Sequence, residues 1–390
     1  MNRIKIYNGK LILENEIREG CVLVEGGKII GVETDPVEFP DSEGVDVKGK
    51  YISPGFIDIH VHGGNNHDFM DATEEAFGEI AAFHARHGTT SMMPTTLTAD
   101  KQGILNTLDV YEKAKSSNKP GSRFVGLHLE GPYFAMDQRG AQDPQYIRDP
   151  DPAEYMEILN HSDSIKRWSI APEKKGAMAL GSILHSKGII ASMAHTDALY
   201  EEAKEAMKNG YTLLTHFYSA MSSVTRKNAM RYAGVVEAGY LHDELFVEII
   251  ADGVHLPAPL LQLILKIKGR DKTILITDAM RGAGMPKGMS ILGNKNTGIP
   301  VLLEDGVAKL VDRTAFAGSV ATADRLIQTM VESGGASLCD AVYMMTRTPA
   351  ILLGLDHQIG SLKKGMDADI ILFDPGYKIS QVWIKGQPFS

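Results

Sequence analysis

The amino-acid sequence predicts an α/β protein whose central part is a (β/α)8 TIM-type barrel. Short apolar runs rich in β-branched residues alternate along the chain with longer segments of helical character. Eight such runs lie between the two ends of the chain, and eight strands in alternation with helices are typical of a closed barrel. Both ends show instead the apolar–polar alternation of half-buried strands, which predicts a separate β unit beside the barrel.

The β unit is expected to combine the two chain ends. Residues 1–53 contain the runs IKIYNGKLI, CVLVEGGKIIGVE and VDVKGKYIS, and the Gly26-Gly27 step is a hairpin signal. Residues 355–390 have the same character in DADIILFDP and ISQVWIKGQPF. We therefore expect both segments to join in one β domain that flanks a catalytic barrel of residues 54–354.

The barrel prediction depends on eight strands that follow one another with helices between several of them. The predicted strands are 56–60, 89–95, 123–130, 167–171, 188–195, 211–216, 245–250 and 273–278. The predicted helices are 73–87, 101–116, 197–208 and 257–267. Residues 279–317 form a glycine-rich insertion with short strand signals of its own. A doubly wound open sheet is the alternative, but no Gly-x-Gly-x-x-Gly pattern follows the first strand.

Composition limits the classes of function. The 390 residues include 43% apolar and 23% charged residues, which is ordinary for a globular protein. The net charge of -9 argues against a general nucleic-acid or anionic-membrane binder, although a phosphorylated small substrate needs only local positive charge. Two cysteines, no signal peptide and no membrane-length apolar run lead us to expect a cytoplasmic protein.

Residues that can bind a metal or carry a proton lie at or just past the carboxyl ends of the predicted strands. These residues are His60, His62, Glu130, His195, His216 and Asp278. The strand carboxyl ends build the active site in barrels of this kind. His60 and His62 are also two residues apart on one strand, so their side chains point to the same side. The sequence therefore predicts that the six side chains meet at one rim.

The chemistry of these side chains suggests their roles. Glu130, His195 and His216 can form a three-ligand metal site that leaves a position open for water. His60 and His62 can hold a second ion, with Glu130 as a bridge between the two. A carboxylate beside such a water can move its proton, and Asp278 is the candidate for this role.

At this point a resemblance to a known family becomes visible. The segments GFIDIHVHG, HLEGPY, AHTDA, THFYSAM, ADGVHL and TDAM occur in the order seen in N-acetylglucosamine-6-phosphate deacetylases, which belong to the metal-dependent amidohydrolase superfamily. The resemblance extends over nearly the whole chain. It implies a barrel flanked by a β-sandwich built from both chain ends. It also implies removal of the acetyl group from an amino-sugar phosphate.

The resemblance assigns roles to individual residues. Glu130, His195 and His216 match the family's metal ligands, and Asp278 matches its catalytic acid and base. His60 and His62 match a pair that supports a second ion in some members. Further positions match residues of the family that contact the substrate; they are His255, Ala220 for a backbone contact to the phosphate, and Arg231 or, as second choice, Arg226. In the family this arginine reaches the phosphate in a neighbouring subunit, which implies a homodimer.

Two positions depart from the family's pattern. Gln142 stands where a substrate-contacting histidine is expected, and Ser219 replaces an asparagine near the phosphate. Glutamine donates a hydrogen bond but carries no titrating proton at neutral pH. These changes keep an N-acetylgalactosamine-6-phosphate deacetylase, or an enzyme for another N-acyl compound, as alternatives. A non-catalytic metal-binding or regulatory homologue is the alternative of another class, and the presence of Asp278 argues against it.

Several expectations remain open at this level. Zinc or iron is favoured as the ion, manganese and cobalt also suit these ligands, and one or two ions per chain are possible. The segment TRKNAMR at 225–231 has a solvated basic helix face as its alternative to phosphate binding. His128, two residues before Glu130, is expected to pack against or support the site without binding the ion.

Overall fold

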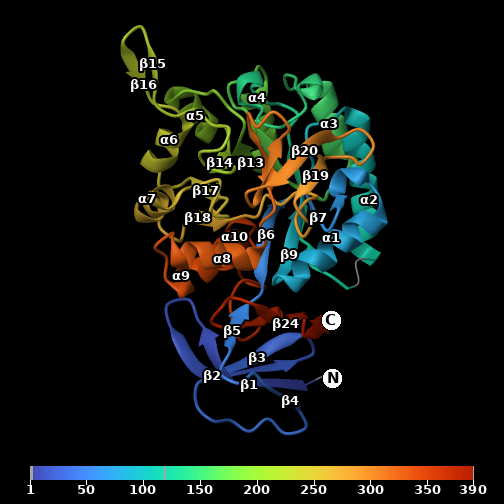
Figure 1. Ribbon diagram of the computed structural model, residues 1–390, viewed down its shortest axis with the longest axis vertical. Coiled ribbons are helices and arrows are strands. Elements are labelled where there is room, and N and C mark those ends of the chain that lie inside the picture. Colours follow the sequence, from blue (N-terminus) through green and yellow to red (C-terminus); the bar gives the residue numbers. More distant parts are fainter. Residues whose placement is uncertain (1–2, 118–119, 390) are drawn as a thin grey trace.

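The computed structural model describes residues 3–117 and 120–389, and it combines parallel strands with helices (Figure 1). Eight parallel strands make up its centre. They are β6 (Phe56–Val61), β9 (Thr89–Pro94), β11 (Leu127–Glu130), β12 (Ile165–Ile170), β13 (Ile190–Met193), β14 (Tyr211–Leu214), β17 (Phe246–Ile249) and β18 (Thr273–Leu275). All eight lie within or close to the predicted segments, so the alternation of strands and helices is confirmed.

The strands are bonded to one another around a ring. Strand β6 pairs in parallel with β9, and β11 to β18 form a continuous parallel series. Beyond β9, Thr96 N donates to His128 O on β11 at 3.0 Å. Beyond β18, Asp278 N donates to His60 O on β6 at 2.9 Å, which connects the last strand to the first. Because all neighbours are parallel, the carboxyl ends of the eight strands meet at one end of the ring.

The ring is covered by helices on its outer side. The helices are α1 (Glu74–Arg86), α2 (Lys101–Ser117), α3 (Pro152–His161), α4 (Ala177–Ser186), α5 (Tyr200–Lys208), α6 (Val235–Leu241), α7 (Ala258–Lys268), α8 (Ala323–Glu332), α9 (Leu338–Met345) and α10 (Arg347–Leu352). The four predicted helices correspond to α1, α2, α5 and α7. Every residue of β6 and β9 is buried, as expected for parallel strands covered on both faces. The largest apolar cluster includes Phe77, Trp168 and Phe217.

The predicted strand 123–130 is wrong in one respect, because the structure divides it in two. Strand β10 (Arg123–Phe124) pairs with β9, whereas β11 pairs with β12. The break includes Gly126, whose φ is 146° and whose missing Cβ would lie 2.4 Å from Lys166 Cγ. A side chain would be both strained and obstructed at this position. Glycine therefore allows the chain to change its strand partner just before Glu130.

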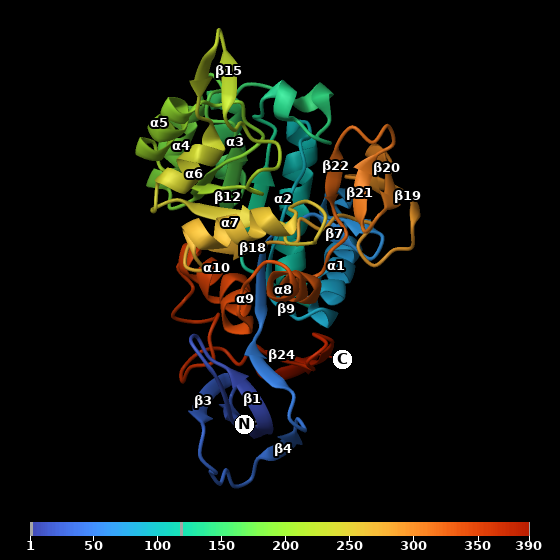
Figure 2. The ribbon, with the colours of Figure 1, turned by 60° about the vertical axis from the view of Figure 1, so that its left-hand side comes forward.

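The two chain ends meet in one sheet away from the ring (Figure 2). Its strands are β1 (Arg3–Ile12), β2 (Ile17–Glu25), β3 (Lys28–Glu33), β4 (Glu43–Asp46), β5 (Tyr51–Pro54), β23 (Ile370–Phe373), β24 (Ile379–Ile384) and β25 (Gln387–Phe389). The antiparallel pairing of β5 with β23 joins the amino-terminal and carboxyl-terminal parts. An apolar cluster of its own, which contains Ile6, Val22, Ile52 and Trp383, fills this part of the molecule.

Two smaller β elements lie near the carboxyl end of the ring. A two-stranded hairpin of β7 (Gly63–Gly64) and β8 (His67–Asp68) follows β6. The glycine-rich insertion forms the four-stranded antiparallel sheet of β19 (Gly288–Leu292), β20 (Ile299–Glu304), β21 (Val307–Leu310) and β22 (Phe316–Ser319). This four-stranded sheet stands to one side of the ring (Figure 2). A bridge between Ala279 and Ser319 connects β22 to the segment after β18.

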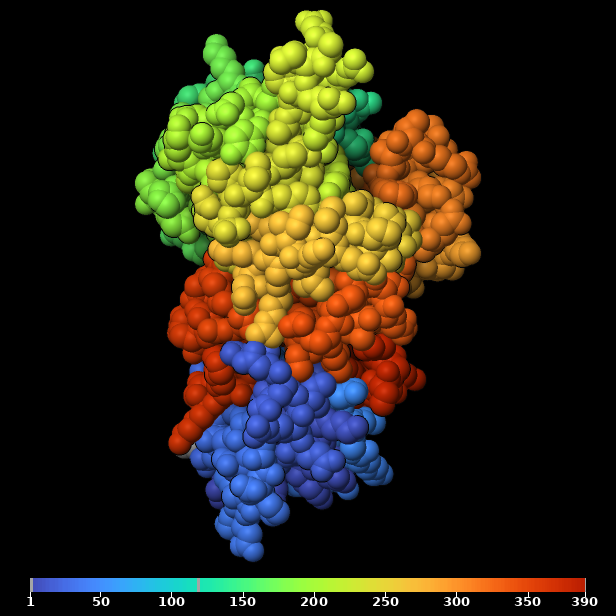
Figure 3. Space-filling view, turned by 90° about the vertical axis from the view of Figure 1, so that its left-hand side faces the viewer, coloured from blue at the N-terminus to red at the C-terminus, as the bar shows by residue number. Residues whose placement is uncertain are grey.

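The basic segment 225–231 is an exposed hairpin and not a helix, so the helix-face alternative is wrong in its structure. Strands β15 (Thr225–Lys227) and β16 (Met230–Tyr232) pair antiparallel, with Arg226 opposite Arg231. The hairpin stands above the rest of the surface (Figures 1 and 3). Among the described residues, no helix has the combination of length and apolar character that a membrane crossing requires.

Candidate metal centre and active site

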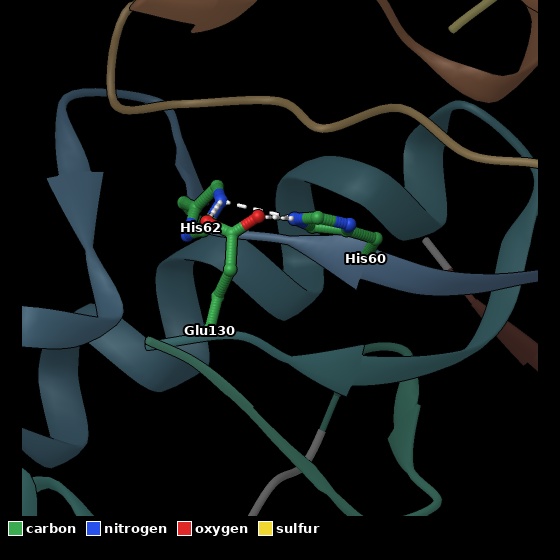
Figure 4. Close-up of side chains that lie close together, drawn as sticks. All are labelled: His60, His62 and Glu130. Carbon is green, nitrogen blue, oxygen red and sulfur yellow. Dashed lines mark hydrogen bonds and ion pairs between the residues drawn. The ribbon is translucent and has the colours of Figure 1, made fainter. Parts of the chain in front are cut away.

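The six side chains that the sequence places at the strand ends converge in the structure. His60 and His62 extend from the end of β6, and Glu130 is the last residue of β11. Figure 4 shows both imidazoles directed at the Glu130 carboxylate. His195, His216 and Asp278 follow β13, β14 and β18 within a few residues, and they face the same carboxylate or the two histidines of β6. The parallel ring thus brings together residues that are more than two hundred positions apart.

Two groups of ligand atoms share Glu130. In the first, His216 Nε2 lies 3.1 Å from Glu130 Oε1 and 3.1 Å from His195 Nε2, and His195 Nε2 lies 3.6 Å from Glu130 Oε1. In the second, His60 Nε2 lies 3.2 Å from His62 Nε2 and 3.2 Å from Glu130 Oε1, while His62 Nε2 lies 3.4 Å from Glu130 Oε2.

These separations fit a metal centre. Nitrogen and oxygen ligands at about 2.0–2.1 Å from a tetrahedral ion are separated from each other by roughly 3.3–3.4 Å. The atoms of both groups are 3.1 to 3.6 Å apart, and all of the residues are buried. Neutral imidazoles with one carboxylate are a donor set that suits zinc, iron, manganese or cobalt. The residues present therefore fit a divalent ion in each group.

The hydrogen bonds behind the histidines set the correct tautomer. Each of the four rings turns Nδ1 toward an oxygen atom, and a carbonyl or carboxylate oxygen can only accept. The acceptors are Gln138 O for His195 at 2.8 Å, Ser219 O for His216 at 3.1 Å, Thr95 O for His62 at 3.3 Å and Glu248 Oε2 for His60 at 3.4 Å. With hydrogen on Nδ1, each neutral ring offers the Nε2 lone pair to the shared centre.

Gln142 contacts a ligand directly. Its Nε2 donates to Glu130 Oε2 at 2.7 Å, and its Oε1 accepts from Thr98 N at 2.8 Å. The backbone donor sets the orientation of the amide, so the amide nitrogen must face Glu130. Gln142 also lines the central cavity, so the residue lies where a substrate contact is possible.

Asp278 faces both His60, on β6, and His62, the residue after β6. Its Oδ1 lies 3.1 Å from His62 Nε2 and 3.5 Å from His60 Nε2. Burial raises the pKa of Asp278, but the facing His60 and His62 outweigh burial and lower this pKa below its usual value. The carboxylate is therefore ionised near neutral pH and can accept a proton.

The electrostatics of the cluster show its need for positive charge. Burial raises the pKa of Glu130, but His60, His195 and His216 bring that pKa well below its usual range. Burial lowers the pKa of His60, yet Glu130 and Asp278 raise it to about 9. Two buried carboxylates thus attract protons to the neighbouring imidazoles. A divalent cation bound among the same atoms supplies that positive charge in place of the protons.

Three of the converging residues have unusual backbone conformations. His195, His216 and Asp278 have φ values of 46°, 31° and 47°, in the left-handed region that residues with side chains seldom adopt. Each comes two or three residues after the end of its strand, where the chain turns. Backbone strain of this kind is concentrated at functional sites. The turns place the three side chains over the centre of the ring.

A cavity of about 390 Å³ opens over the centre. The predicted substrate residues Gln142, Ser219, Ala220 and His255 all line it. His255 Nδ1 bonds to Asp252 Oδ2 at 2.7 Å, which fixes the ring. Two predicted residues are not in this cavity. Arg226 and Arg231 lie on the exposed hairpin, so the structure does not bring them to the site of their own chain.

Sequence reasoning did not identify several residues that support the site. Phe316 lines the cavity, with its ring centroid 4.7 Å from that of His255. Glu248 and Asp252 hold His60 and His255, respectively. Glu248 is an acidic residue within the apolar run LFVEII, which was a usable signal. His128 bonds to Ser169 Oγ at 2.7 Å and belongs to neither ligand group, in agreement with the expectation for it.

Comparison with known proteins agrees with this geometry. Residues 51–388 match the model of the amidohydrolase family. The chain is 32% identical over 365 residues to N-acetylgalactosamine-6-phosphate deacetylase of Escherichia coli O157:H7, a match that covers 93% of each chain. It is 34% identical over 337 residues to N-acetylglucosamine-6-phosphate deacetylase of Vibrio furnissii, with 86% of this chain and 82% of the relative covered.

Solved structures show the same similarity. N-acetyl-D-glucosamine-6-phosphate deacetylase of Mycobacterium smegmatis, solved as a mutant with N-acetyl-D-glucosamine-6-phosphate, matches with a TM-score of 0.91 at 27% identity, over 100% of both chains. The enzyme from Pasteurella multocida matches with a TM-score of 0.92 at 26% identity, over 99% of both chains. The ring is thus of the TIM-barrel type found in these neighbours.

The chain belongs to the amidohydrolase family, whose members use divalent metal ions. Within that family it belongs with the N-acetylglucosamine-6-phosphate deacetylases, as the extent of the match to these relatives shows. The resemblance seen in the sequence motifs is confirmed.

Proposed function

We propose that this protein hydrolyses the N-acetyl group of N-acetylglucosamine-6-phosphate to give glucosamine-6-phosphate and acetate. The observation that carries the proposal is the pair of ligand groups sharing Glu130, with the ionised Asp278 beside them in the lining of a cavity. This is the arrangement that hydrolysis of an unactivated amide needs. The relatives with this activity support the choice of substrate.

The proposal assigns metal ligation to the two groups. Glu130, His195 and His216 hold one divalent ion, and His60 and His62 hold a second, with Glu130 in common. Zinc or iron is our first choice, and manganese or cobalt also suits the ligands. An ion in such a site lowers the pKa of a bound water toward neutrality and polarises a carbonyl oxygen.

The residues of the chain then manage the protons and the substrate. Asp278 accepts the proton of the attacking water and delivers it to the amide nitrogen, which must be protonated to leave as an amine. His255, fixed by Asp252, presents its Nε2 edge for a substrate hydroxyl or carbonyl. Gln142, whose amide is already oriented, offers its second N–H to the sugar or acyl group.

We further propose a homodimer in which the hairpin completes the neighbouring site. Ser219 and Ala220 line the cavity, and the backbone at Ala220 is suited to receive the phosphate. The arginines of the chain's own hairpin are not part of that cavity, so a cation for the phosphate must come from elsewhere. Arg231, or else Arg226, of a second copy provides it, since arginine makes bidentate contacts with phosphate.

The same proposal covers the architecture and the cellular setting. The eight-stranded ring of residues 54–354 is a (β/α)8 barrel, and residues 1–53 and 355–390 form the β-sandwich beside it. We place the junction between β5 and β6, close to residue 51, where the match to the amidohydrolase family begins. Cys21 and Cys339 are both buried and free, which supports a reducing cytoplasmic environment.

A deacetylase for N-acetylgalactosamine-6-phosphate is the second candidate. Two observations favour it: Gln142 and Ser219 differ from the pattern of N-acetylglucosamine-6-phosphate deacetylases, and the galactosamine enzyme of Escherichia coli is 32% identical to this chain. The two sugars differ only in the configuration of one hydroxyl. A hydrogen-bonding site can discriminate strongly on such a difference.

The test is acetate release by protein of known metal content. The panel comprises N-acetylglucosamine-6-phosphate, N-acetylgalactosamine-6-phosphate and both sugars without phosphate. A kcat/KM at least tenfold higher for the glucosamine compound supports the first proposal, and the reverse order supports the second. No acetate from any of the four with a full metal complement would refute a deacetylase of phosphorylated amino sugars.

A further inference from the structure

Directly behind the metal-ligand groups, the interior of the ring contains a buried ion pair. Arg167 on β12 and Glu248 on β17 face each other there, and both are 0% exposed. Arg167 Nη2 donates to Glu248 Oε2 at 2.8 Å, and Nη1 donates to Oε1. The pair is expensive to bury, and pairs of this kind are often no more stabilising than apolar residues of similar volume. Stability is therefore a poor explanation for it.

The carboxylate of this pair contacts one ligand from each metal group. Glu248 Oε2 accepts from His60 Nδ1 at 3.4 Å and from the backbone N of His216, also at 3.4 Å. Arg167 is held in turn by Ser192 Oγ at 3.1 Å, Thr215 Oγ1 at 2.8 Å and Ile59 O at 3.3 Å. The guanidinium thus supports the carboxylate, and the carboxylate supports the ligands.

Two of the three groups that contact the Glu248 carboxylate can only donate. Arg167 cannot accept a hydrogen bond, and a backbone N–H cannot either. The remaining neighbour, His60 Nδ1, can donate or accept according to its tautomer. Beside an ionised carboxylate the ring must donate from Nδ1, which leaves the lone pair on Nε2, the atom 3.2 Å from both Glu130 Oε1 and His62 Nε2. In His62, His195 and His216, a backbone carbonyl oxygen accepts from Nδ1 and leaves the lone pair on Nε2 in the same way.

We propose that Glu248, held by Arg167, is the positioning residue that sets the tautomer and orientation of His60 and thereby enables binding of the second ion. This inference rests on the two-ion part of the proposed function. It goes beyond that function by assigning control of the second ion to a residue that contacts neither the ion nor the substrate. His216 depends on Glu248 less, because its own Nδ1 is held by Ser219 O.

Replacing Glu248 by glutamine tests the mechanism with a minimal change in shape. The amide has one donor end and one acceptor end, while all its neighbours require acceptors. If its oxygen faces His60, its NH2 group opposes Arg167; if its NH2 group faces His60, the imidazole must carry hydrogen on Nε2. Loss of such a supporting contact typically weakens metal affinity about 10- to 100-fold. We expect that loss for the second ion, and a change of no more than about twofold for the first.

The measurement is equilibrium dialysis of zinc against the full-length protein, followed by a two-step binding isotherm. A His60→Gln/His62→Asn variant identifies which step belongs to the second ion. Asp369→Asn is the matched control, because Asp369 is also a buried carboxylate paired with an arginine, Arg123, but immediately precedes β23 in the sheet of the chain ends. We expect the control to bind both ions normally. Unfolding temperatures show whether each variant is folded.

A second variant distinguishes a wrongly oriented amide at position 248 from general disruption of the buried pair. In Arg167→Met/Glu248→Gln the guanidinium no longer opposes the NH2 group, so the amide oxygen can turn to His60. We expect the double variant to bind the second ion at least tenfold more tightly than Glu248→Gln does. Equal affinity of the double and single variants, or equal loss at both ion sites in Glu248→Gln, would overturn the inference.

Neutron diffraction from zinc-loaded wild-type crystals tests the same point without a variant. A deuteron on His60 Nδ1, directed at Glu248, is expected, and a deuteron on His60 Nε2 would overturn the inference. Failure of the underlying proposal looks different. If wild-type protein binds a single ion with His60 and His62 intact, the two-ion proposal falls together with this one. If wild-type and Glu248→Gln proteins both bind two ions equally well, only this inference falls.

Discussion

The role of Asp278 gives the sharpest prediction, because asparagine suits its position in every respect except charge. The backbone of Asp278 is held on both sides, by Asp278 N donating to His60 O at 2.9 Å and by Ser319 N donating to Asp278 O at 2.8 Å. Its φ is 47°, a conformation that asparagine adopts more readily than most residues. Asp278→Asn should therefore fold normally and retain the shape of the site.

The expected loss of activity follows from the missing proton transfer. The ionised carboxylate lies 3.1 Å from His62 Nε2, where it can accept a proton from water at the shared centre. General acid–base catalysis contributes about 100- to 10,000-fold, and at about 1.4 kcal/mol for each factor of ten this corresponds to roughly 3–5 kcal/mol of transition-state stabilisation. We expect kcat to fall by that factor and KM to change little.

The assay is acetate release under saturating N-acetylglucosamine-6-phosphate, with metal content measured on the same samples. Asp305→Asn is the matched control, since Asp305 also has a left-handed backbone, with φ of 52°, but lies at an exposed turn far along the insertion. A variant at Asp278 that keeps its metal and more than about half the wild-type rate would refute the acid–base assignment.

Four further predictions concern the metals and the phosphate. Replacing His60 by Gln and His62 by Asn should lower the metal count from two per chain to one, and an unchanged count would assign the pair a structural role. Arg231→Ala should raise KM about 10- to 100-fold for the phosphorylated sugar, given about 1.5–3 kcal/mol for a charge-assisted hydrogen bond, and much less for the unphosphorylated sugar. Mixed dimers of Arg231→Ala with a His195→Ala metal-site variant should regain activity; no recovery despite confirmed subunit exchange would exclude the cross-subunit contact. Removal of metal by a chelator should lower the unfolding temperature, because an ion at a thousand times its Kd stabilises the folded state by about 4 kcal/mol; calorimetry that shows equal melting with and without chelator would contradict tight binding by the folded site.

The strand ends were predictable from the sequence because parallel strands impose a simple rule. A buried parallel strand is a short apolar run, and its carboxyl end is visible where polar residues begin. His62, Glu130 and Asp278 stand at such points, so their convergence followed from the alternation of strands and helices. The break at Gly126 was not predictable, because it depends on Lys166 of the neighbouring strand.

The buried pair that supports the ligand histidines was harder to predict from the sequence. Arg167 and Glu248 are 81 positions apart, and only the closed ring places them face to face. Glu248 is the one charged residue of β17, and Arg167 is the buried member of the Lys166-Arg167 pair in β12. A charged residue in such a strand signals a buried polar contact but does not identify its partner. The hairpin around Arg226 was missed for another reason, since its short strands have too few residues to show a period.

The three residues with left-handed backbone conformation, His195, His216 and Asp278, link the stability of the fold to the geometry of the site. A residue with a side chain in this conformation costs of order 1–3 kcal/mol and persists only where its surroundings determine it. Here the surroundings are the ring itself: Ser219 N donates to His216 O at 2.8 Å, and Asp278 bonds to His60 and Ser319 through its backbone. His195 O accepts from Ala135 N at 2.9 Å, in the loop after β11. Each of the three residues is thus fixed by a backbone bond to a neighbouring segment or to the turn that follows it. A shift of one residue in any of these strands would turn its side chain away from the centre. The ligand geometry is therefore a property of the whole closed ring, and it requires all of its strands to be paired.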